Sequence, residues 1–179
     1  MCDLFSKPYL KSYYGDTMAD KAHFATLFDY HWHTTRHLLE CAAKLDTADY
    51  TADSGYGHGS IHTIFIHLLL TDRGWRVALE TGKQPAPLSF DEYPDLAALQ
   101  RGYADEQADW QTLFAGWNND DIAGDVTLTR WGGGSTTFAL WRVLQHLSLH
   151  GMQHHSELAY LLTSKGHSPG NIDFLFFQG

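Results

Sequence analysis

The chain has 179 residues, 44% of them hydrophobic, and its 12 Lys and Arg against 21 Asp and Glu give a formal net charge of -9. This length and composition predict one globular domain over residues 1–179 and exclude an intrinsically disordered protein. The negative charge and the scattered basic residues argue against a nucleic-acid partner. The longest apolar run, 64–70, is far shorter than a membrane span, so no membrane association is expected.

The two cysteines, Cys2 and Cys41, cannot form a disulfide framework. The first residues also lack the basic start and apolar stretch of a secretory signal. Both features are typical of a protein of the reducing cytoplasm, and a cytoplasmic location is expected.

Helical periodicity predicts two long helices in the first half of the chain. The first covers about 20–45, where apolar residues recur every three or four positions. The second covers about 60–80, with Ser60 as its N-cap and Gly82 at its end. Its middle, Ile-Phe-Ile-His-Leu-Leu-Leu, is apolar nearly all round, which indicates burial on most sides.

After a loop with Pro85, Pro87 and Pro94, a third helix is predicted over about 95–117. Residues 125–137 alternate around three glycines, which is typical of a short hairpin. A fourth helix is predicted over about 137–165. The fold predicted is therefore all-α: a four-helix bundle with a long crossover connection and a short hairpin-like excursion before the last helix.

Histidine is the unusual residue of this chain, with 12 copies. His150 and His154 lie four residues apart on the apolar stripe of the fourth helix, and an i, i+4 pair can bind one metal ion. His67 occupies the apolar middle of the second helix, where an imidazole without a partner is costly. The sequence therefore predicts a divalent metal site formed by His67, His150 and His154.

The other histidines have less specific interpretations. His31 and His146 are candidates for a fourth ligand; the alternatives are a hydrogen-bonded core residue for His31 and a supporting position for His146. His155 is expected to face solvent or a neighbouring helix. Six more are assigned to the surface or to loops: His23, His33, His37, His58, His62 and His167.

Other chemistries have little support in the sequence. There is no His-Glu-x-x-His, Glu-x-x-His, Walker A or Gly-x-Ser-x-Gly pattern. Neither cysteine has a visible activating base, so the catalytic residues are unknown and a nucleophile would have to come from a metal-activated molecule. Asp72, one turn beyond His67, is the nearest candidate base; its alternative role is a salt bridge with Arg73 or Arg76.

Three motifs resemble the DinB/YfiT-like family. His67-Leu-Leu-Leu-Thr-Asp-Arg-Gly-Trp75 is similar to the family's H-x4-[DE]-R-x-W in the second helix, and His150-Gly-Met-Gln-His154 is similar to its H-x3-H in the fourth. Pro169-Gly-Asn-Ile-Asp-Phe-Leu-Phe-Phe177 resembles its apolar C-terminal signature. The resemblance covers the chain from the Tyr30 region to Phe177.

The resemblance implies a four-helix bundle, often a homodimer, that holds zinc or nickel through His67, His150 and His154. It implies activation of a low-molecular-weight thiol, as in S-transferases and isomerases, or of water, as in hydrolases, acting on a small-molecule substrate. Ser156-Glu157 and the Tyr30-His-Trp-His segment depart from the family pattern at positions that shape the pocket. The alternative is a non-enzymatic metal- or ligand-binding bundle, which a fourth protein ligand would favour.

Overall fold

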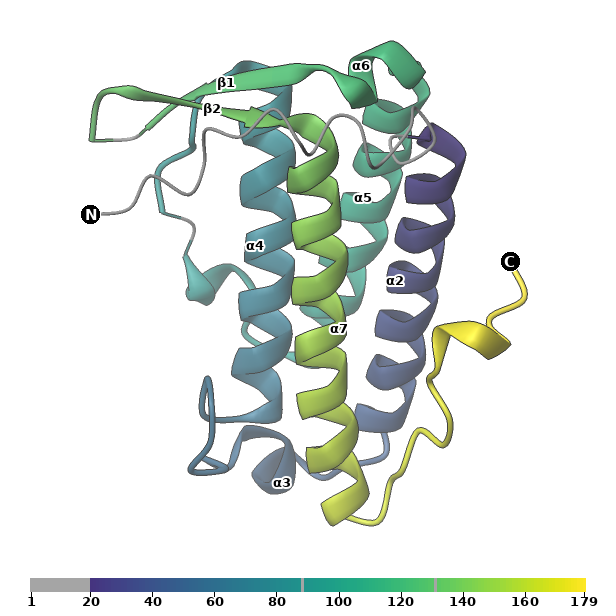
Figure 1. The fold of residues 1–179 in the computed structure, drawn as a ribbon. Helices are drawn as coiled ribbons and strands as arrows, with labels where there is room; N and C mark the ends of the chain where they lie inside the picture. The colour runs from purple at the N-terminus through teal and green to yellow at the C-terminus, as the bar shows by residue number, and fades with distance from the viewer. Residues whose placement is uncertain (1–19, 88, 131) are drawn as a thin grey trace, which may run out of the picture.

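The computed structural model describes residues 20–87, 89–130 and 132–179, so Cys2 and the first part of the predicted domain lie outside the described residues. Four long helices form a bundle (Figure 1): α2 (Lys21–Ala42), α4 (Ile61–Thr81), α5 (Leu96–Ala115) and α7 (Leu140–Ser164). Helices α2 and α4 each pack against both α5 and α7, which places α2 and α4 on a diagonal. The prediction of an all-α bundle is confirmed.

The connection between α4 and α5 is the long crossover. Tyr103 donates to the Phe65 carbonyl at 2.7 Å near one end of the two helices, and Arg76 binds Glu106 further along. Residue numbers therefore rise together in α4 and α5, and the helices are parallel neighbours. The described parts of the chain between them, 82–87 and 89–95, lie along the bundle and include the short helix η1 (Phe90–Glu92) (Figure 1).

Side-chain caps set the helix bounds close to those predicted. Ser60 accepts a hydrogen bond from the Thr63 amide, and the Thr63 hydroxyl binds the Ser60 amide in return, which is a capping box. Gly82 follows α4 in the left-handed conformation with φ 70°, a conformation that favours glycine. Asp20 and Asp95 cap α2 and α5 through their side chains, as Ser60 caps α4.

The predicted hairpin is present, but it extends further than expected. Strands β1 (Asp125–Thr129) and β2 (Ser135–Ala139) are antiparallel, with Asp125 opposite Ala139. The predicted start of the fourth helix at Thr137 is wrong, because Thr137 pairs with Thr127 in the ladder and α7 begins at Leu140. Two short helices, α3 (Thr47–Thr51) and α6 (Asn119–Ala123), were also not predicted, since five residues hold too little periodicity.

All four long helices contribute to one apolar core, whose fully buried side chains include Phe24, Leu38, Phe65, Leu68, Leu99, Trp110 and Leu144. Cys41 is buried in this core. Of the helices in the described part of the chain, none is long and apolar enough to cross a membrane.

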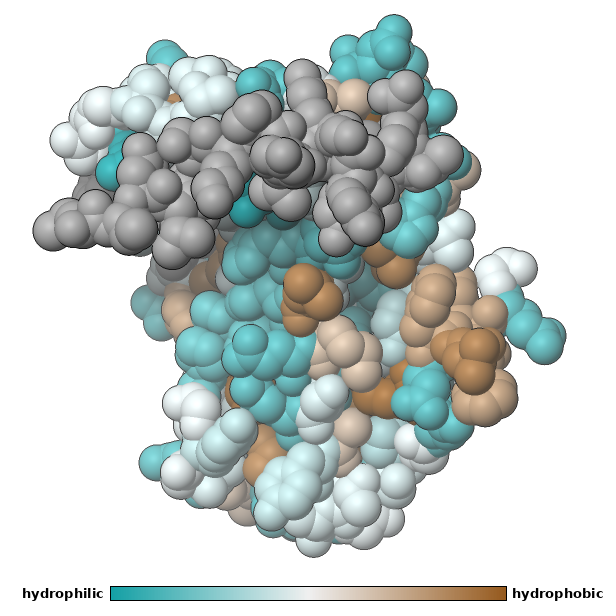
Figure 2. Space-filling view, in the orientation of Figure 1, coloured by the Kyte–Doolittle hydropathy of each residue, from teal (hydrophilic) through white to brown (hydrophobic). Residues whose placement is uncertain are grey.

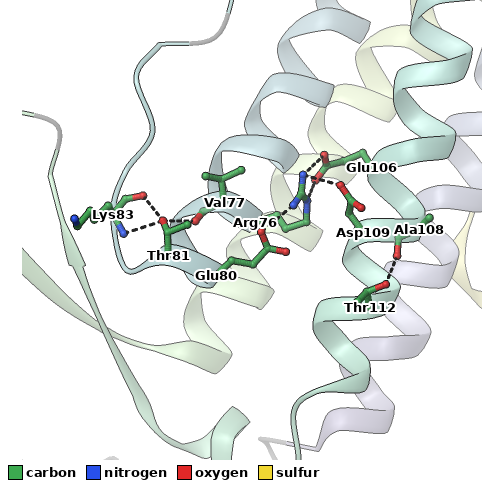
Figure 3. Close-up of polar contacts among 9 residues, drawn as sticks. All are labelled: Arg76, Val77, Glu80, Thr81, Lys83, Glu106, Ala108, Asp109 and Thr112. Atoms are coloured by element: carbon green, nitrogen blue, oxygen red, sulfur yellow. Dashed lines mark hydrogen bonds and ion pairs between the residues drawn. The ribbon is translucent and has the colours of Figure 1, made fainter.

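A buried ion pair crosses between α4 and α5. The Arg76 guanidinium binds the two Glu106 carboxylate oxygens at 2.6 and 3.0 Å, and the Glu106 residue is 3% exposed. Arg76 also binds Glu80 at 2.9 Å on its own helix and Asp109 at 3.0 Å on α5 (Figure 3). The bidentate geometry orients both side chains and links the two parallel helices.

Helices α2 and α7 approach each other closely at Gly151. A Cβ atom at this position would lie 2.4 Å from Nδ1 of His31, which is buried and held by Asp72. We expect Gly151→Ala to lower the free energy of unfolding by about 1–3 kcal/mol, because His31 cannot move aside without losing that bond. Urea denaturation measures the change.

Gly74→Ala is the matched control, because Gly74 also lies within a helix but a Cβ atom added there would have no neighbouring atom within 4 Å. This change should raise stability by about 0.5–1 kcal/mol through helix propensity. A stabilising Gly151→Ala would contradict the close approach.

Candidate metal centre

The structure brings the three predicted ligands together between α4 and α7. The Nε2 atom of His150 lies 3.3 Å from Nε2 of His67 and 3.1 Å from Nε2 of His154. Two imidazoles bound to one tetrahedral zinc ion at about 2.0–2.1 Å have their nitrogens about 3.3 Å apart. The spacing therefore suits a shared ion, and a cluster of histidines at this place is compatible with metal binding.

No placement of the protons on the three neutral rings gives every ring nitrogen of the cluster a hydrogen-bond partner in the described part of the chain. The Nδ1–H of His154 donates to Glu157 at 2.7 Å, so the His154 Nε2 presents a lone pair. If His150 carries its proton on Nδ1, two lone pairs face each other across 3.1 Å. If His150 carries its proton on Nε2, that N–H can donate a hydrogen bond to His67 or to His154, but not to both. In either case the buried Nδ1 of His150 has no hydrogen-bond partner among the described residues. A cation among the Nε2 atoms removes the conflict between lone pairs.

The electrostatics keep the rings in the form that binds metals. Burial, and next the positive charge of neighbouring histidines, lowers the pKa of both His67 and His150 to about 4. Both rings are therefore neutral at pH 7, and a neutral imidazole is the form of histidine that ligates.

Glu157 is the carboxylate that sequence reasoning missed. It lies one turn after His154 on α7, and its side chain is 11% exposed. A carboxylate on the outer nitrogen fixes the tautomer and the orientation of a ligating ring and increases its basicity. The i, i+3 spacing of His154 and Glu157 on one helix was the available signal, because such residues are neighbours on a helix surface.

His58 is the second residue that sequence reasoning missed. It was assigned to the surface or a loop, and it is an exposed loop residue. Its ring stacks on His67 with centroids 3.8 Å apart and meets His154 edge-on at 5.2 Å. His58, His67 and His154 each offer a ring nitrogen within 4.8 Å of the others. Nothing in the sequence pattern links a loop histidine to a helix face.

The remaining candidates lie outside the cluster. His31 is hydrogen-bonded to Asp72 at 3.0 Å, which is the predicted alternative to a fourth ligand. The exposed His146 ring lies 6.0 Å from the His150 ring between centroids. His155 is fully buried and binds Thr35 of α2 at 2.8 Å, so the helix neighbour is the correct alternative and solvent is not.

The expected salt bridge of Asp72 with an arginine is wrong. Asp72 is 2% exposed and its carboxylate binds His31. Arg73 instead binds Glu92, and Arg76 binds acidic residues of α4 and α5. Asp72 is thus turned into the bundle toward α2, and its bond to His31 joins α4 to the diagonally placed α2 across the core.

A cavity of about 410 Å³ lies between α4, the hairpin and the segment 84–87, and none of the cluster histidines lines it. Leu70, Gly74 and Ala78 line it, three, seven and eleven residues after His67 and hence on nearly the same stripe of the helix. Gly74 lies about 10 Å from His67 along the helix axis. Trp75 lines the cavity, and its ring lies 6.1 Å from the ring of His146, one turn before His150.

The half-buried His67 and His150 and the buried His155 also predict how stability depends on pH. The folded-state pKa of His67 and of His150 is about 4, and burial lowers the pKa of His155 well below its usual 6.5. Stability without metal is then complete above about pH 6.5 and falls as the pH approaches 4, with a slope of about 1.4 kcal/mol per pH unit for each proton that only the unfolded chain binds.

Urea denaturation in the presence of a chelator, from neutral pH downward, measures this slope. For His155→Gln, the free energy of unfolding is measured relative to the variant's own value at neutral pH. Its decrease at lower pH is expected to correspond to one bound proton fewer than in the wild type. A free energy of unfolding that stays constant between about pH 7 and pH 5 would contradict the burial of neutral rings.

Comparison with family models gives a match that covers α4 and α7, the two helices that carry the predicted ligands. Residues 18–179 match the model of the DinB family. No curated protein gives a match. The matched range also includes the loop that carries His58.

Proposed function

Since the chain belongs to the DinB family, we propose that it binds a divalent metal ion, zinc or nickel, through His67, His150 and His154 and uses it in chemistry on a small molecule. The observation that carries the proposal is the convergence of three Nε2 atoms, with His150 3.3 and 3.1 Å from its two neighbours. Glu157 supports it by keeping the His154 proton on Nδ1, away from the cluster.

The nucleophile is a low-molecular-weight thiol or a water molecule. A zinc ion held by His67, His150 and His154 would lower the pKa of either, which would make a nucleophile available at neutral pH. The described part of the chain offers no comparable group of its own near the cluster: Cys41 is 3% exposed within the core. Three histidine ligands leave one coordination position for such a molecule.

The substrate is a small molecule with an apolar body. The cavity beside α4 is lined mainly by apolar side chains, among them Leu70, Trp75, Leu128 and Phe138. A ligand that fills it reaches along the stripe of α4 toward His67. Its reactive end would then meet the histidine cluster while its apolar part stays in the cavity.

The test combines metal analysis with activity. The protein is expressed without a polyhistidine tag, its metal content is measured, and it is assayed with glutathione, bacillithiol and mycothiol plus electrophiles, and with a hydrolase panel. His150→Ala should lose the metal and the activity together, whereas His23→Ala, an exposed histidine on α2, should keep both. Thiol transfer that persists in His150→Ala without metal would overturn the mechanism.

A second candidate function is metal or ligand binding without catalysis. The observation that favours it is His58, which shares the cluster with His67 and His154. A permanent fourth protein ligand would close the coordination sphere, as in structural zinc sites. Metal that is retained in full while no substrate of either panel reacts would favour this candidate.

We also expect a homodimer, as the family resemblance implies. Large apolar side chains are exposed on α7, with Leu149 63% and Tyr160 71% exposed, and on the C-terminal segment, with Leu175 83% exposed. Figure 2 shows hydrophobic residues gathered over the C-terminal segment. Burying such a surface stabilises an assembly.

Light scattering of the wild type at micromolar concentration is expected to give twice the chain mass of 20.2 kDa. Leu149→Ser with Tyr160→Ser should shift the protein toward the monomer if α7 forms the interface. A monomeric wild type would contradict the assembly.

A further inference from the structure

The loop between α3 and α4, residues 52–59, places His58 against the predicted ligands. Its ring lies nearly parallel to that of His67, with an angle of 18° between the planes, and it also contacts His154. No hydrogen bond to the His58 side chain is found within the described part of the chain. The ring nitrogens are therefore available to a further partner.

The backbone of this loop is held by hydrogen bonds to its carbonyl groups, and it contains three glycines with positive φ. The Thr63 hydroxyl donates to the His58 carbonyl at 2.6 Å, and the Ser54 amide donates to the Gly59 carbonyl at 2.9 Å. Between and beside these anchors, Gly55, Gly57 and Gly59 have φ of 69°, 57° and 90°. Only glycine adopts such angles at little cost, so small changes of loop conformation are accessible here.

The loop also passes close to the carboxylate that orients His154. A Cβ atom added at Gly57 would lie 3.8 Å from Oε2 of Glu157, which is van der Waals contact. The loop thus lies directly over the side of the cluster formed by His154 and Glu157.

We infer that His58 is a fourth, displaceable metal ligand: it closes the coordination sphere in the resting protein and leaves it when a thiol or substrate binds. This inference rests on the proposed three-histidine metal site. The nitrogens of His58, His67 and His154 lie within 4.8 Å of one another, whereas a tetrahedral ion requires about 3.3 Å. Because the in-plane lone pairs of two nearly parallel rings cannot point at one ion, the His58 ring has to turn out of its stack on His67 to bind, and a rotation of this exposed side chain supplies that movement.

His58 is the ligand expected to leave the ion, because its side chain is held less firmly than those of the other three histidines. His67, His150 and His154 project from packed helices and are preorganised, while His58 is exposed and must be ordered by the ion at an entropic cost. Because binding the ion orders His58 at an entropic cost, an incoming thiolate replaces His58 before the other three ligands. His58 would therefore protect the ion from other ligands until substrate arrives.

The test uses His58→Phe, which keeps an aromatic ring to stack on His67 but has no nitrogen to bind a metal. Tyr56→Ala, a change at an exposed aromatic residue of the same loop, is the control. Zinc affinity is measured by competition with a chelator, and the number of imidazole ligands by X-ray absorption of the zinc protein. 2-Mercaptoethanol serves as the thiol probe with the cobalt-substituted protein.

The wild type should show four imidazoles, and three on saturation with 2-mercaptoethanol. His58→Phe should show three imidazoles from the start, bind zinc at least about 10-fold more weakly, the lower end of what loss of a supporting contact causes, and bind the thiol more tightly. Tyr56→Ala should match the wild type.

Three imidazoles in the wild type, or equal zinc affinity of wild type and His58→Phe, would overturn the role of His58 and leave the three-histidine site standing. The same loss of affinity in Tyr56→Ala would assign the effect to the loop and would also overturn it. A wild type that binds no zinc would overturn the proposed function together with this inference.

Discussion

Replacing His154 by alanine is expected to abolish tight binding of zinc. The change removes an Nε2 atom that lies 3.1 Å from that of His150, and it also leaves Glu157 without the ring that it orients. We expect the dissociation constant for zinc to rise by more than about 100-fold, the upper end of the loss caused by removing an orienting partner alone. Competition with a chelator measures it, and circular dichroism verifies that the helices remain.

Two further variants divide this effect between ligand and orienting group. Glu157→Ala keeps all three imidazoles but removes the acceptor of the His154 proton, so an intermediate loss of about 10–100-fold is expected. His146→Ala removes an exposed imidazole one turn before His150 on the same helix and should leave zinc affinity unchanged. If His146→Ala weakened zinc binding as much as His154→Ala, the assignment of ligands would be incorrect.

The second large effect concerns stability and arises at Arg76. Arg76→Met preserves most of the aliphatic stem but leaves the Glu106 carboxylate, with a side chain 4% exposed, without its cation. Removing one partner of a buried ion pair costs about 3–5 kcal/mol, because a charge remains without compensation in a medium of low polarity. We expect a loss of that size in urea denaturation at neutral pH.

Arg73→Ala is the matched control, three residues earlier on α4. Its pair with Glu92 joins side chains that are 35% and 46% exposed, and such a pair contributes at most about 1 kcal/mol. The double variant Arg76→Met, Glu106→Leu should recover most of the stability, since apolar groups of similar volume replace both charges. A double variant as unstable as Arg76→Met would show that packing, and not the stranded charge, causes the loss.

The pH dependence of Arg76→Met provides an independent check. Burial raises the pKa of the Glu106 carboxyl, and Arg76 opposes that rise. Without Arg76 the folded-state pKa rises further above that of the unfolded chain. The folded variant then binds a proton that the unfolded chain releases, so its deficit relative to wild type should shrink as the pH falls below the raised pKa.

The sequence by itself determined the long helices and the histidine pair. Ser60, Gly82 and Asp95 act through contacts within a few residues, so local chemistry was sufficient to locate helix ends. His150 and His154 are brought together by one turn of helix, which needs no knowledge of the rest of the fold. His67 was identified because its apolar surroundings require a partner for the imidazole.

Only the tertiary structure decided which other groups meet that pair. His58 reaches the cluster through a loop, where no periodicity relates position to direction. Asp72 binds His31 and not its sequence neighbour Arg73, because the packing of α2 beside the site brings an imidazole to a buried carboxylate. His155 turns to Thr35 for the same reason. Contacts of this kind join residues 41 and 120 positions apart, and their energies depend on helix positions that local sequence does not encode.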